Sequence, residues 1–314
     1  MNSPLIYIPR FRDAEVYMPA MRIEGEYTLK VYGRDRKLRR QVGPFPNLVL
    51  DNGLDLFGSV ANNVALVSGI VVGTGNATPT NADTQLQSLV AGTTSSVASS
   101  TASATSGAKY SLYSITYRFA EGVAAGNLAE VGARGASNTS LFSRALIVDG
   151  GGSPTTLTVL SDEFLDVTYT YRRYLPETDG TGTISISATS YDWTTRGGLY
   201  SDWTGLNVGS NGVSMGLRAY ANTLPALGSA PTGASDSGTS LTQQTYTNGN
   251  YYRDYLGTQS LTVLNVTGGA FSTLKFDVPG LGAINMGFNN PIPKDGTKVL
   301  ALGVRVSWDR KTLP

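Results

Sequence analysis

The run Tyr113-Ser114-Ile115-Thr116-Tyr117-Arg118-Phe119 alternates apolar and polar side chains at every step. Leu165-Asp166-Val167-Thr168-Tyr169-Thr170-Tyr171 repeats the scheme, and so does a run near the end of the chain in which Leu300, Leu302, Val304, Val306 and Trp308 share one face. A period of two gives a β-strand one apolar face and one polar face. Because such faces are buried by stacking two sheets, these runs predict an all-β fold, an elaborated antiparallel β-sandwich of jelly-roll-like type.

The composition supports strands and restricts the chemistry. The 314 residues include 37 Gly but only 15% charged residues, a balance that favours strands and tight turns over helices. His and Cys are both absent. Imidazole bases, thiol nucleophiles and the usual zinc sites are therefore excluded, and disulfides cannot stabilise the fold. We expect no cofactor and no metal.

Three prolines lie near the beginning of the chain. Pro4, Pro9 and Pro19 forbid a helix and discourage central strand pairing, so residues 1–22 are predicted to form an extended N-terminal arm. We expect the arm to lie on the rest of the chain or on a neighbouring subunit. Its possible partner-binding residues are Ile6, Tyr7, Ile8, Phe11 and Tyr17. Residues 23–314 are predicted to form a single β-sandwich domain with a loop-rich insertion at about 190–295.

Two further segments of the predicted domain are ambiguous. Residues from about 92 to 107 are nearly all Ser, Thr, Ala and Gly, and they bury little apolar surface. This tract is either a mobile loop or a strand pair that a partner makes regular. In the segment 48–57, Asp51 or Asn52 is suited to cap a short helix, but Asn52-Gly53 equally suits a hairpin turn.

A cluster of cations follows the first predicted strand. The segment contains one acid, Asp35, and five cations, Arg34, Arg36, Lys37, Arg39 and Arg40, of which the last four are possible partner-binding residues. Such a cluster suits phosphate or an acidic protein surface, but it also suits a solvated hairpin tip. The net charge of the whole chain is only +1, which argues against a broadly basic face, so no nucleic-acid partner is expected.

One succession of segments is familiar. Asn47-Leu48-Val49-Leu50-Asp51-Asn52-Gly53-Leu54 precedes the glycine-stopped run Ile70-Val71-Val72-Gly73-Thr74-Gly75, and strand-like runs at 113–122, 127–132, 141–147 and 164–171 follow. This order resembles structural tail and fibre-associated proteins of tailed bacteriophages.

The resemblance implies a structural virion subunit of the tail, as a collar, baseplate or fibre-attachment component, assembled in the host cytoplasm. It implies a homo-oligomer, with a trimer favoured because fibre-related proteins are commonly threefold, and contacts with other virion proteins. A capsid decoration protein, which also combines a β-sandwich with an N-terminal arm, is an alternative within the virion.

Glycoside hydrolysis by two carboxylates is the mechanism that remains without His and Cys. The acids available to it are Glu121, Glu130, Asp162, Glu163 and Asp192. Polysaccharide-cleaving enzymes of phage tails are usually long, repetitive β-helices, however, and this chain has no internal repeat. We interpret Glu130 and Glu163 as strand-end acids that bind backbone amides or pair with Arg144 or Arg172. The protein is therefore predicted not to be an enzyme.

The aromatic residues of the predicted insertion suggest an alternative function. Trp193, Trp203, Tyr251 and Tyr252 lie among Gly, Asn, Ser and Asp, and exposed rings of this kind stack on sugars. The alternative is a carbohydrate-binding host-attachment module whose partner is a host surface polysaccharide. The competing interpretation is that the rings fill a second small core. No apolar run approaches the roughly 20 residues of a membrane-spanning helix, so no membrane span is expected.

Overall fold

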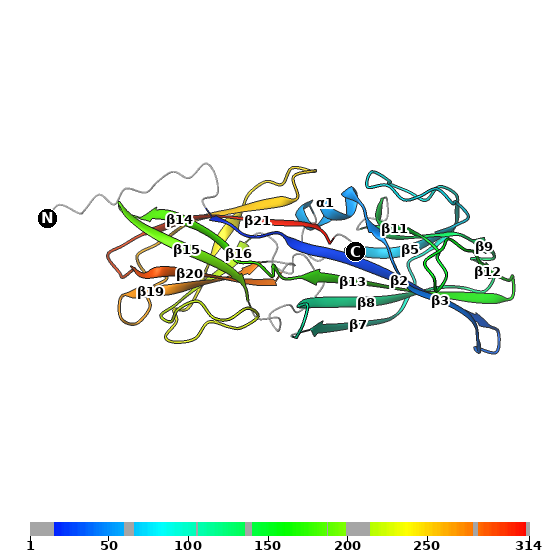
Figure 1. The fold of residues 1–314 in the computed structure, drawn as a ribbon, viewed down its shortest axis with the longest axis horizontal. Helices are drawn as coiled ribbons and strands as arrows, with labels where there is room; N and C mark the ends of the chain where they lie inside the picture. Colours follow the sequence, from blue (N-terminus) through cyan, green and yellow to red (C-terminus); the bar gives the residue numbers. More distant parts are fainter. Residues whose placement is uncertain are drawn as a thin grey trace. The chain divides into compact units, whose positions relative to one another are not determined.

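The structure, a computed structural model, describes residues 16–59, 66–104, 106–135, 140–186, 188–198, 214–278 and 282–311. These residues form 21 strands and one helix, which confirms the predicted all-β class (Figure 1). The chain divides into two compact units, each assembled from separate segments of the sequence. Unit 1 comprises residues 1–21, 104–109 and 174–308, and unit 2 comprises residues 22–103, 110–173 and 309–314. The single domain expected from the sequence stays a prediction.

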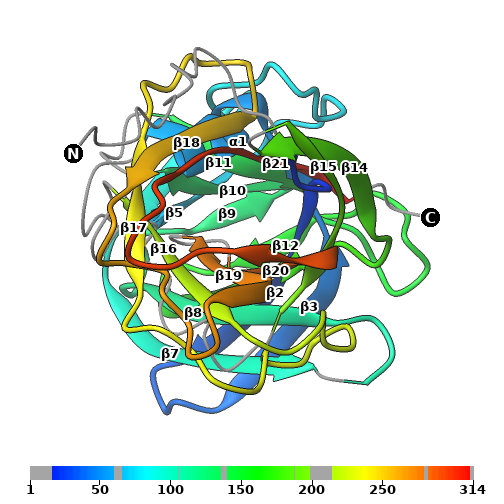
Figure 2. The same ribbon diagram turned by 90° about the vertical axis from the view of Figure 1, so that its left-hand side faces the viewer.

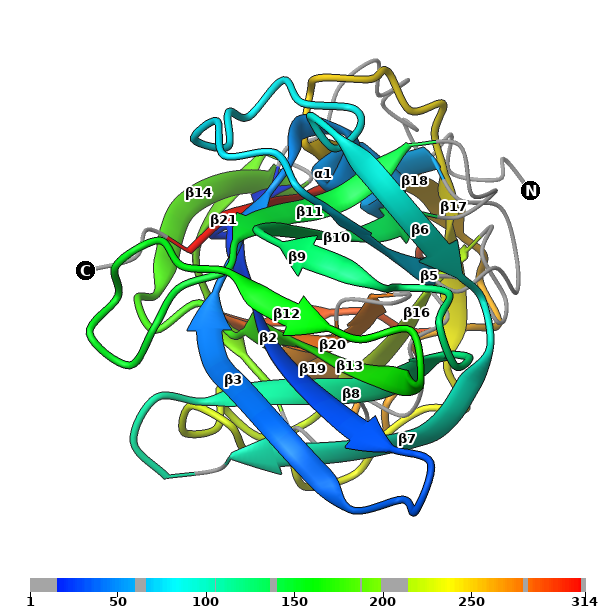
Figure 3. The same ribbon diagram turned by 90° about the vertical axis from the view of Figure 1, so that its right-hand side faces the viewer.

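Unit 2 contains two main sheets, a short ribbon and the helix (Figure 3). One sheet has the order β2-β13-β8-β7, with β3 paired to β2, and the other has the order β4-β11-β10-β5-β6. The ribbon joins β9 to β12. The elements are β2 (Met21–Gly33), β3 (Leu38–Pro46), β4 (Leu48–Val49), α1 (Asp51–Ser59), β5 (Val67–Gly73), β6 (Leu89–Thr93), β7 (Ser96–Ala104), β8 (Tyr110–Phe119), β9 (Gly126–Leu128), β10 (Glu130–Gly135), β11 (Leu141–Leu146), β12 (Leu157–Val159) and β13 (Glu163–Tyr174).

The predicted alternation is clear in β8 but incomplete in β13. Ile115, Tyr117 and Phe119 of β8 are buried, whereas the residues between them are half-buried. In β13, Asp166 on the predicted polar face is buried as well. Arg118 of the neighbouring β8 donates two hydrogen bonds to its carboxylate, at 2.6 and 2.7 Å. Side chains of an adjacent strand therefore cover this polar face, which a single-strand pattern does not reveal.

The two sheets of unit 2 face each other across a cluster of aromatic rings. The ring centroids of Tyr27 on β2 and Tyr169 on β13 are 4.8 Å apart, and Phe142 on β11 lies 6.2 Å from Tyr169. The hydroxyl groups of Tyr27 and Ser143, from opposite sheets, hydrogen-bond at 2.8 Å. All three rings are fully buried. Each such pair contributes about 0.5–1.5 kcal/mol beyond the area it buries, so this cluster defines the sandwich-like core.

Alkaline pH is expected to unfold unit 2 through these tyrosines. Burial raises the pKa of Tyr27, Tyr169 and Tyr171 above the ordinary value of 10.0. Their stabilising contribution is complete below that value and is lost as the pH rises towards the folded-state pKa, because only the unfolded chain ionises freely. Tyrosinate absorbance and circular dichroism should therefore change together above about pH 10. Ionisation of all 17 tyrosines with the circular dichroism unchanged would contradict this expectation.

Unit 1 is one curled sheet with the order β14-β15-β20-β19-β16-β17-β18-β21 (Figure 2). Neighbouring strands of this order are antiparallel, whereas β1 pairs in parallel with β21. The elements are β1 (Val16–Tyr17), β14 (Gly180–Ile186), β15 (Thr189–Gly197), β16 (Ser214–Tyr220), β17 (Thr239–Gln243), β18 (Tyr252–Gln259), β19 (Ala270–Val278), β20 (Gly282–Pro293) and β21 (Leu300–Arg310).

Residues 16–21 pack within unit 1. Besides pairing with β21, β1 lies against β14, so it contacts strands from both ends of the curled sheet. Val16, Met18 and Met21 are buried. Residues that the sequence assigns to the arm therefore belong to a core, and the apolar alternation of β2 already begins at Met21.

The segment at about 190–295, expected to be rich in loops, supplies most strands of unit 1. It holds β16 to β20 and nearly all of β15, joined by long connections at 221–238, 244–251 and 260–269. Met215, Leu217, Phe276 and Met286 from these strands are fully buried or nearly so. Glycine, Asn and Ser are frequent here because the connections are long, while the strands between them remain apolar on one face.

Candidate functional site

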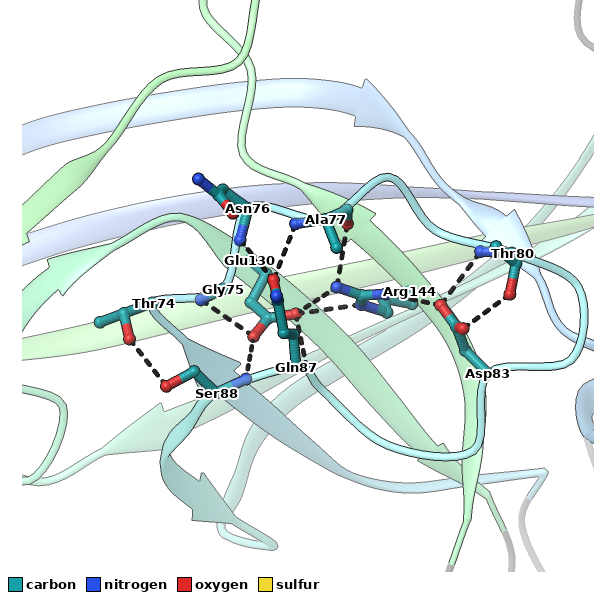
Figure 4. Close-up of polar contacts among 10 residues, drawn as sticks. All are labelled: Thr74, Gly75, Asn76, Ala77, Thr80, Asp83, Gln87, Ser88, Glu130 and Arg144. Carbon is teal, nitrogen blue, oxygen red and sulfur yellow. Dashed lines mark hydrogen bonds and ion pairs between the residues drawn. The ribbon is translucent and has the colours of Figure 1, made fainter.

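A buried carboxylate closes the loop between β5 and β6 (Figure 4). Glu130, at the start of β10, is fully buried. Its Oε1 atom accepts hydrogen bonds from the backbone amides of Gly75 at 3.1 Å and Ser88 at 2.8 Å, and its Oε2 atom accepts one from Gln87 at 3.1 Å. Both ends of the loop at 74–88 are therefore tied to one side chain. Gly75 is required here, since a Cβ atom on it would lie 2.4 Å from Oε1 of Glu130.

Arg144 of β11 completes this network. Its Nε atom donates to Glu130 at 3.0 Å, its Nη1 atom to Asp83 at 2.5 Å and its Nη2 atom to the carbonyl oxygen of Ala77 at 3.0 Å (Figure 4). Burial raises the pKa of Asp83, but hydrogen bonds from Thr80 and Arg144 and the charge of Arg144 outweigh burial, so the pKa lies below its ordinary value. The predicted pairing of Glu130 with Arg144 is confirmed. Asp83 as a third member was missed, because loop residues carry no periodic signal.

The other predicted strand-end acid has a different partner. The carboxylate of Glu163 accepts a hydrogen bond from the backbone amide of Leu160 at 2.8 Å, as expected, and it pairs with Arg40. Arg172 instead donates to both oxygens of Glu26, at 3.0 and 2.9 Å. Both predicted strand-end acids, Glu130 and Glu163, therefore accept hydrogen bonds from backbone amides and pair with arginines.

The basic segment covers the turn between β2 and β3 and continues into the first residues of β3 (Figure 3). Arg40 pairs with Glu163 and Arg39 with Asp35, the latter at 3.0 Å. Among the described residues, Arg36 and Lys37 have no ion pair, and both are exposed. The hairpin-tip interpretation describes this geometry, and the positive charge available to a partner is reduced to Arg36 and Lys37.

The four proposed sugar-binding aromatics do not form one group. Trp193 is 5% exposed and its ring lies over Gly182 of the neighbouring strand, so it has no open face. Trp203 lies outside the described residues. Tyr251 and Tyr252 are half-buried at the start of β18, and the guanidinium of Arg305 lies 3.6 Å from the ring centroid of Tyr252. Among the three of these residues that the structure describes, there is therefore no pair of exposed, coplanar rings.

Of the proposed arm contacts, Tyr17 alone can be placed. Its side chain is 53% exposed, and the guanidinium of Arg305 lies 5.4 Å from its ring centroid. Ile6, Tyr7, Ile8 and Phe11 lie outside the described residues.

The Ser, Thr and Ala tract forms exposed strands at sheet edges. β6 is the last strand of one sheet of unit 2 and β7 is the last strand of the other (Figure 3). The stretch 89–104 contains no charged residue and no proline. Leu89 and Val97 are 58% and 46% exposed, and all side chains from Ser96 to Ser103 are exposed, so both faces of β7 are open. The tract therefore forms strands, but β6 and β7 belong to different sheets and do not form the strand pair that the sequence offered as an alternative.

Other kinds of site find little support in the described part of the chain. It holds no group of three Asp or Glu side chains placed to bind a metal ion. None of its helices is long and apolar enough to cross a membrane.

Comparisons with known proteins leave the family open. No protein-family model, no curated protein and no solved structure matches this chain.

Proposed function

We propose that the chain is a structural subunit of a bacteriophage tail, a collar, baseplate or fibre-attachment component that acts through self-assembly and contacts with other virion proteins. The proposal starts from the resemblance in residues 47–54 and 70–75. In the structure the first segment forms β4 and the beginning of α1. The second forms the end of β5 and the first residues of the loop at 74–88, which Glu130 holds at both ends and which we call the clamped loop. The observation that supports an assembly role most directly is the exposed edge formed by β7.

β7 lacks the features that protect sheet edges in monomeric proteins. Natural edges usually carry charged side chains, above all Lys, or Pro, because unpaired backbone amide and carbonyl groups recruit other strands. β7 has neither over nine residues. Its two open faces also bury almost nothing, although ordering each residue of a strand costs about 1–2 kcal/mol in backbone entropy. A partner that pairs with the edge supplies the missing stabilisation.

A second copy of this chain is the occupant that fits the edge. An uncharged strand meets an identical strand without like charges opposite each other, which destabilise cross-strand pairs. Ser and Ala side chains are small and allow neighbouring strands to approach on both faces. If β7 of one copy pairs with β7 of another, the two copies are related by a twofold axis and form a dimer. If β7 of one copy pairs instead with a different sheet edge of the next copy, the contacts can close a ring such as the favoured trimer.

Lysines on β7 are expected to dissociate the oligomer without unfolding the subunit. Ser99→Lys with Ser103→Lys places two charges on one exposed face of the edge. We expect light scattering to show a multimer for the parent chain and a monomer for this variant, while circular dichroism shows that the variant is still folded. The matched control is Ser153→Lys with Ser161→Lys, which adds the same charges in exposed loops of unit 2 and should leave the multimer intact.

The number of copies in the parent multimer shows which edges pair. A dimer identifies pairing of β7 with itself, and a trimer identifies a ring. A parent chain that is monomeric at micromolar concentration, or a multimer that survives both lysines on β7, would overturn assembly through this edge.

A further inference from the structure

Lys294 follows β20 and occupies a core position of unit 1. Exposed and buried residues alternate from Pro291 to Lys294, so Lys294 lies on the same inward face as Ile292. Its side chain and backbone together are 1% exposed. The backbone amide of Lys294 donates to the carbonyl oxygen of Gly269 at 2.9 Å, which anchors the residue against the connection before β19. A lysine in such a position is unusual, because burying an ammonium group is strongly unfavourable unless a charge pairs with it.

The amine of Lys294 has only neutral partners. Its Nζ atom donates to the side-chain oxygen of Asn265 at 2.8 Å and to the backbone carbonyl oxygen of Asp295 at 3.3 Å. No ion pair joins it to a carboxylate of the described residues, and the carboxylate of Asp295 is 2.6 Å from Lys298 instead. The neutral amine is therefore the form that this environment accommodates best.

Burial and the neighbouring charges shift the pKa of Lys294 in opposite directions. Burial lowers the pKa of Lys294, Asp295 and Asp236 raise it, and Lys298 lowers it again. The net result is a pKa below the ordinary value, which increases the fraction of neutral, nucleophilic amine at physiological pH.

The carboxamide of Asn265 is held in place by a strained turn. Leu264, the preceding residue, has a φ of 58°, a left-handed conformation that is rare for a residue other than Gly, Asn or Asp. The carboxylate of Asp236 accepts hydrogen bonds from the amides of Leu264 and Ala219, both at 3.0 Å, and fixes this turn against β16. The Nδ2 atom of Asn265 donates to the carbonyl oxygen of Leu261 at 2.6 Å. Strain of this kind persists only where the surroundings enforce it, and it concentrates at functional positions.

We propose that Lys294 and Asn265 join in an intramolecular isopeptide bond between Nζ and Cγ. The lone pair of the neutral amine attacks Cγ, and the carbonyl electron pair moves to Oδ1. When the carbonyl bond reforms, the bond between Cγ and Nδ2 breaks. A proton passes from Nζ to Nδ2, so the leaving group is ammonia and the product is a secondary amide. No oxidant, cofactor or second substrate is consumed.

The fold supplies what this reaction needs. It holds the amine and the carboxamide in contact inside a core, which replaces a bimolecular encounter by an intramolecular one. The bond would tie the connection at 260–269 to the end of β20 and close a loop of the chain from Asn265 to Lys294. This inference concerns unit 1 alone and does not rest on the proposed assembly through β7.

Mass spectrometry of the full chain tests the bond. The folded parent protein is expected to weigh less than its sequence by one molecule of ammonia, and a tryptic digest should contain a branched peptide that joins Asn265 to Lys294, with no cleavage after Lys294. Lys294→Met and Asn265→Ala should each restore the full mass. Lys298→Met is the matched control, because it removes a neighbouring lysine and should retain the cross-link.

The branched peptide decides the outcome. A succinimide at an asparagine also releases ammonia, but it forms no branch and is unaffected by Lys294→Met. A parent protein of full mass that trypsin cleaves after Lys294 would overturn the proposal, as would a loss of ammonia that persists in Lys294→Met. Since the parent protein carries the decisive measurement, failure of a variant to fold leaves the test intact.

Discussion

Glu130→Ala is expected to reduce the free energy of unfolding by about 3–5 kcal/mol, because it removes one carboxylate of a buried ion-pair network and leaves buried amide groups without an acceptor. Arg144 keeps its contact with Asp83 but loses Glu130. The amides of Gly75, Gln87 and Ser88 lose their acceptor at the same time. Unfolding in urea, followed by circular dichroism, measures the effect, and protease cleavage within 74–88 should become faster.

Two comparisons identify the cause of this loss. Glu121→Ala removes an exposed ion pair with Arg34 and should change stability little. Glu130→Ala combined with Arg144→Ala should destabilise less than the sum of the single changes, because both single changes remove the same contact between Glu130 and Arg144. If Glu130→Ala has no larger effect than Glu121→Ala, the clamped loop does not contribute to the stability of unit 2.

Tyr169→Asp is expected to prevent unit 2 from folding. The ring of Tyr169 is fully buried between Tyr27 and Phe142, and a carboxylate there would be both unpaired and surrounded by aromatic rings. Burying an isolated charge costs more than the marginal stability of a typical domain, so the group must stay protonated or the core must open. Circular dichroism and proteolysis of the purified variant measure the loss.

The neighbouring positions supply the controls for Tyr169. Thr168→Asp, on the other face of β13, removes a 2.8 Å contact between the hydroxyl groups of Thr168 and Thr116 and should be far milder. Tyr169→Phe keeps the ring and loses a 3.1 Å hydrogen bond from Asn47, which should cost about 0.5–1.5 kcal/mol. Equal damage from both aspartates would show that neither face of β13 tolerates a charge.

The fold class and much of the core could be predicted because strand periodicity is local. Alternation in β8 and β21 identifies Ile115, Tyr117, Val304 and Val306 as buried, and the structure buries all four. The absence of His and Cys likewise restricts the chemistry without any knowledge of the fold. For the Ser, Thr and Ala tract the sequence left open a mobile loop or a strand pair made regular by a partner, since composition reveals how little the tract can bury but not which strands it joins.

Partners across the structure could not be predicted in the same way, because they depend on strand register and on segments that are distant in sequence. Glu163 pairs with Arg40, 123 positions away, where the sequence suggested Arg144 or Arg172. Trp193 is buried because β14 places Gly182 under its ring.

By itself, then, the sequence determined that the chain forms strands with one apolar face and which reactions lack their side chains, since both follow from residue type and a period of two. Only the tertiary structure decided how interleaved segments divide into two units, that Asp83 joins Glu130 and Arg144, and that the amine of Lys294 meets Asn265. These contacts are made between loops and strand ends, where no periodic pattern constrains the chain and position is set by the packing of everything around it.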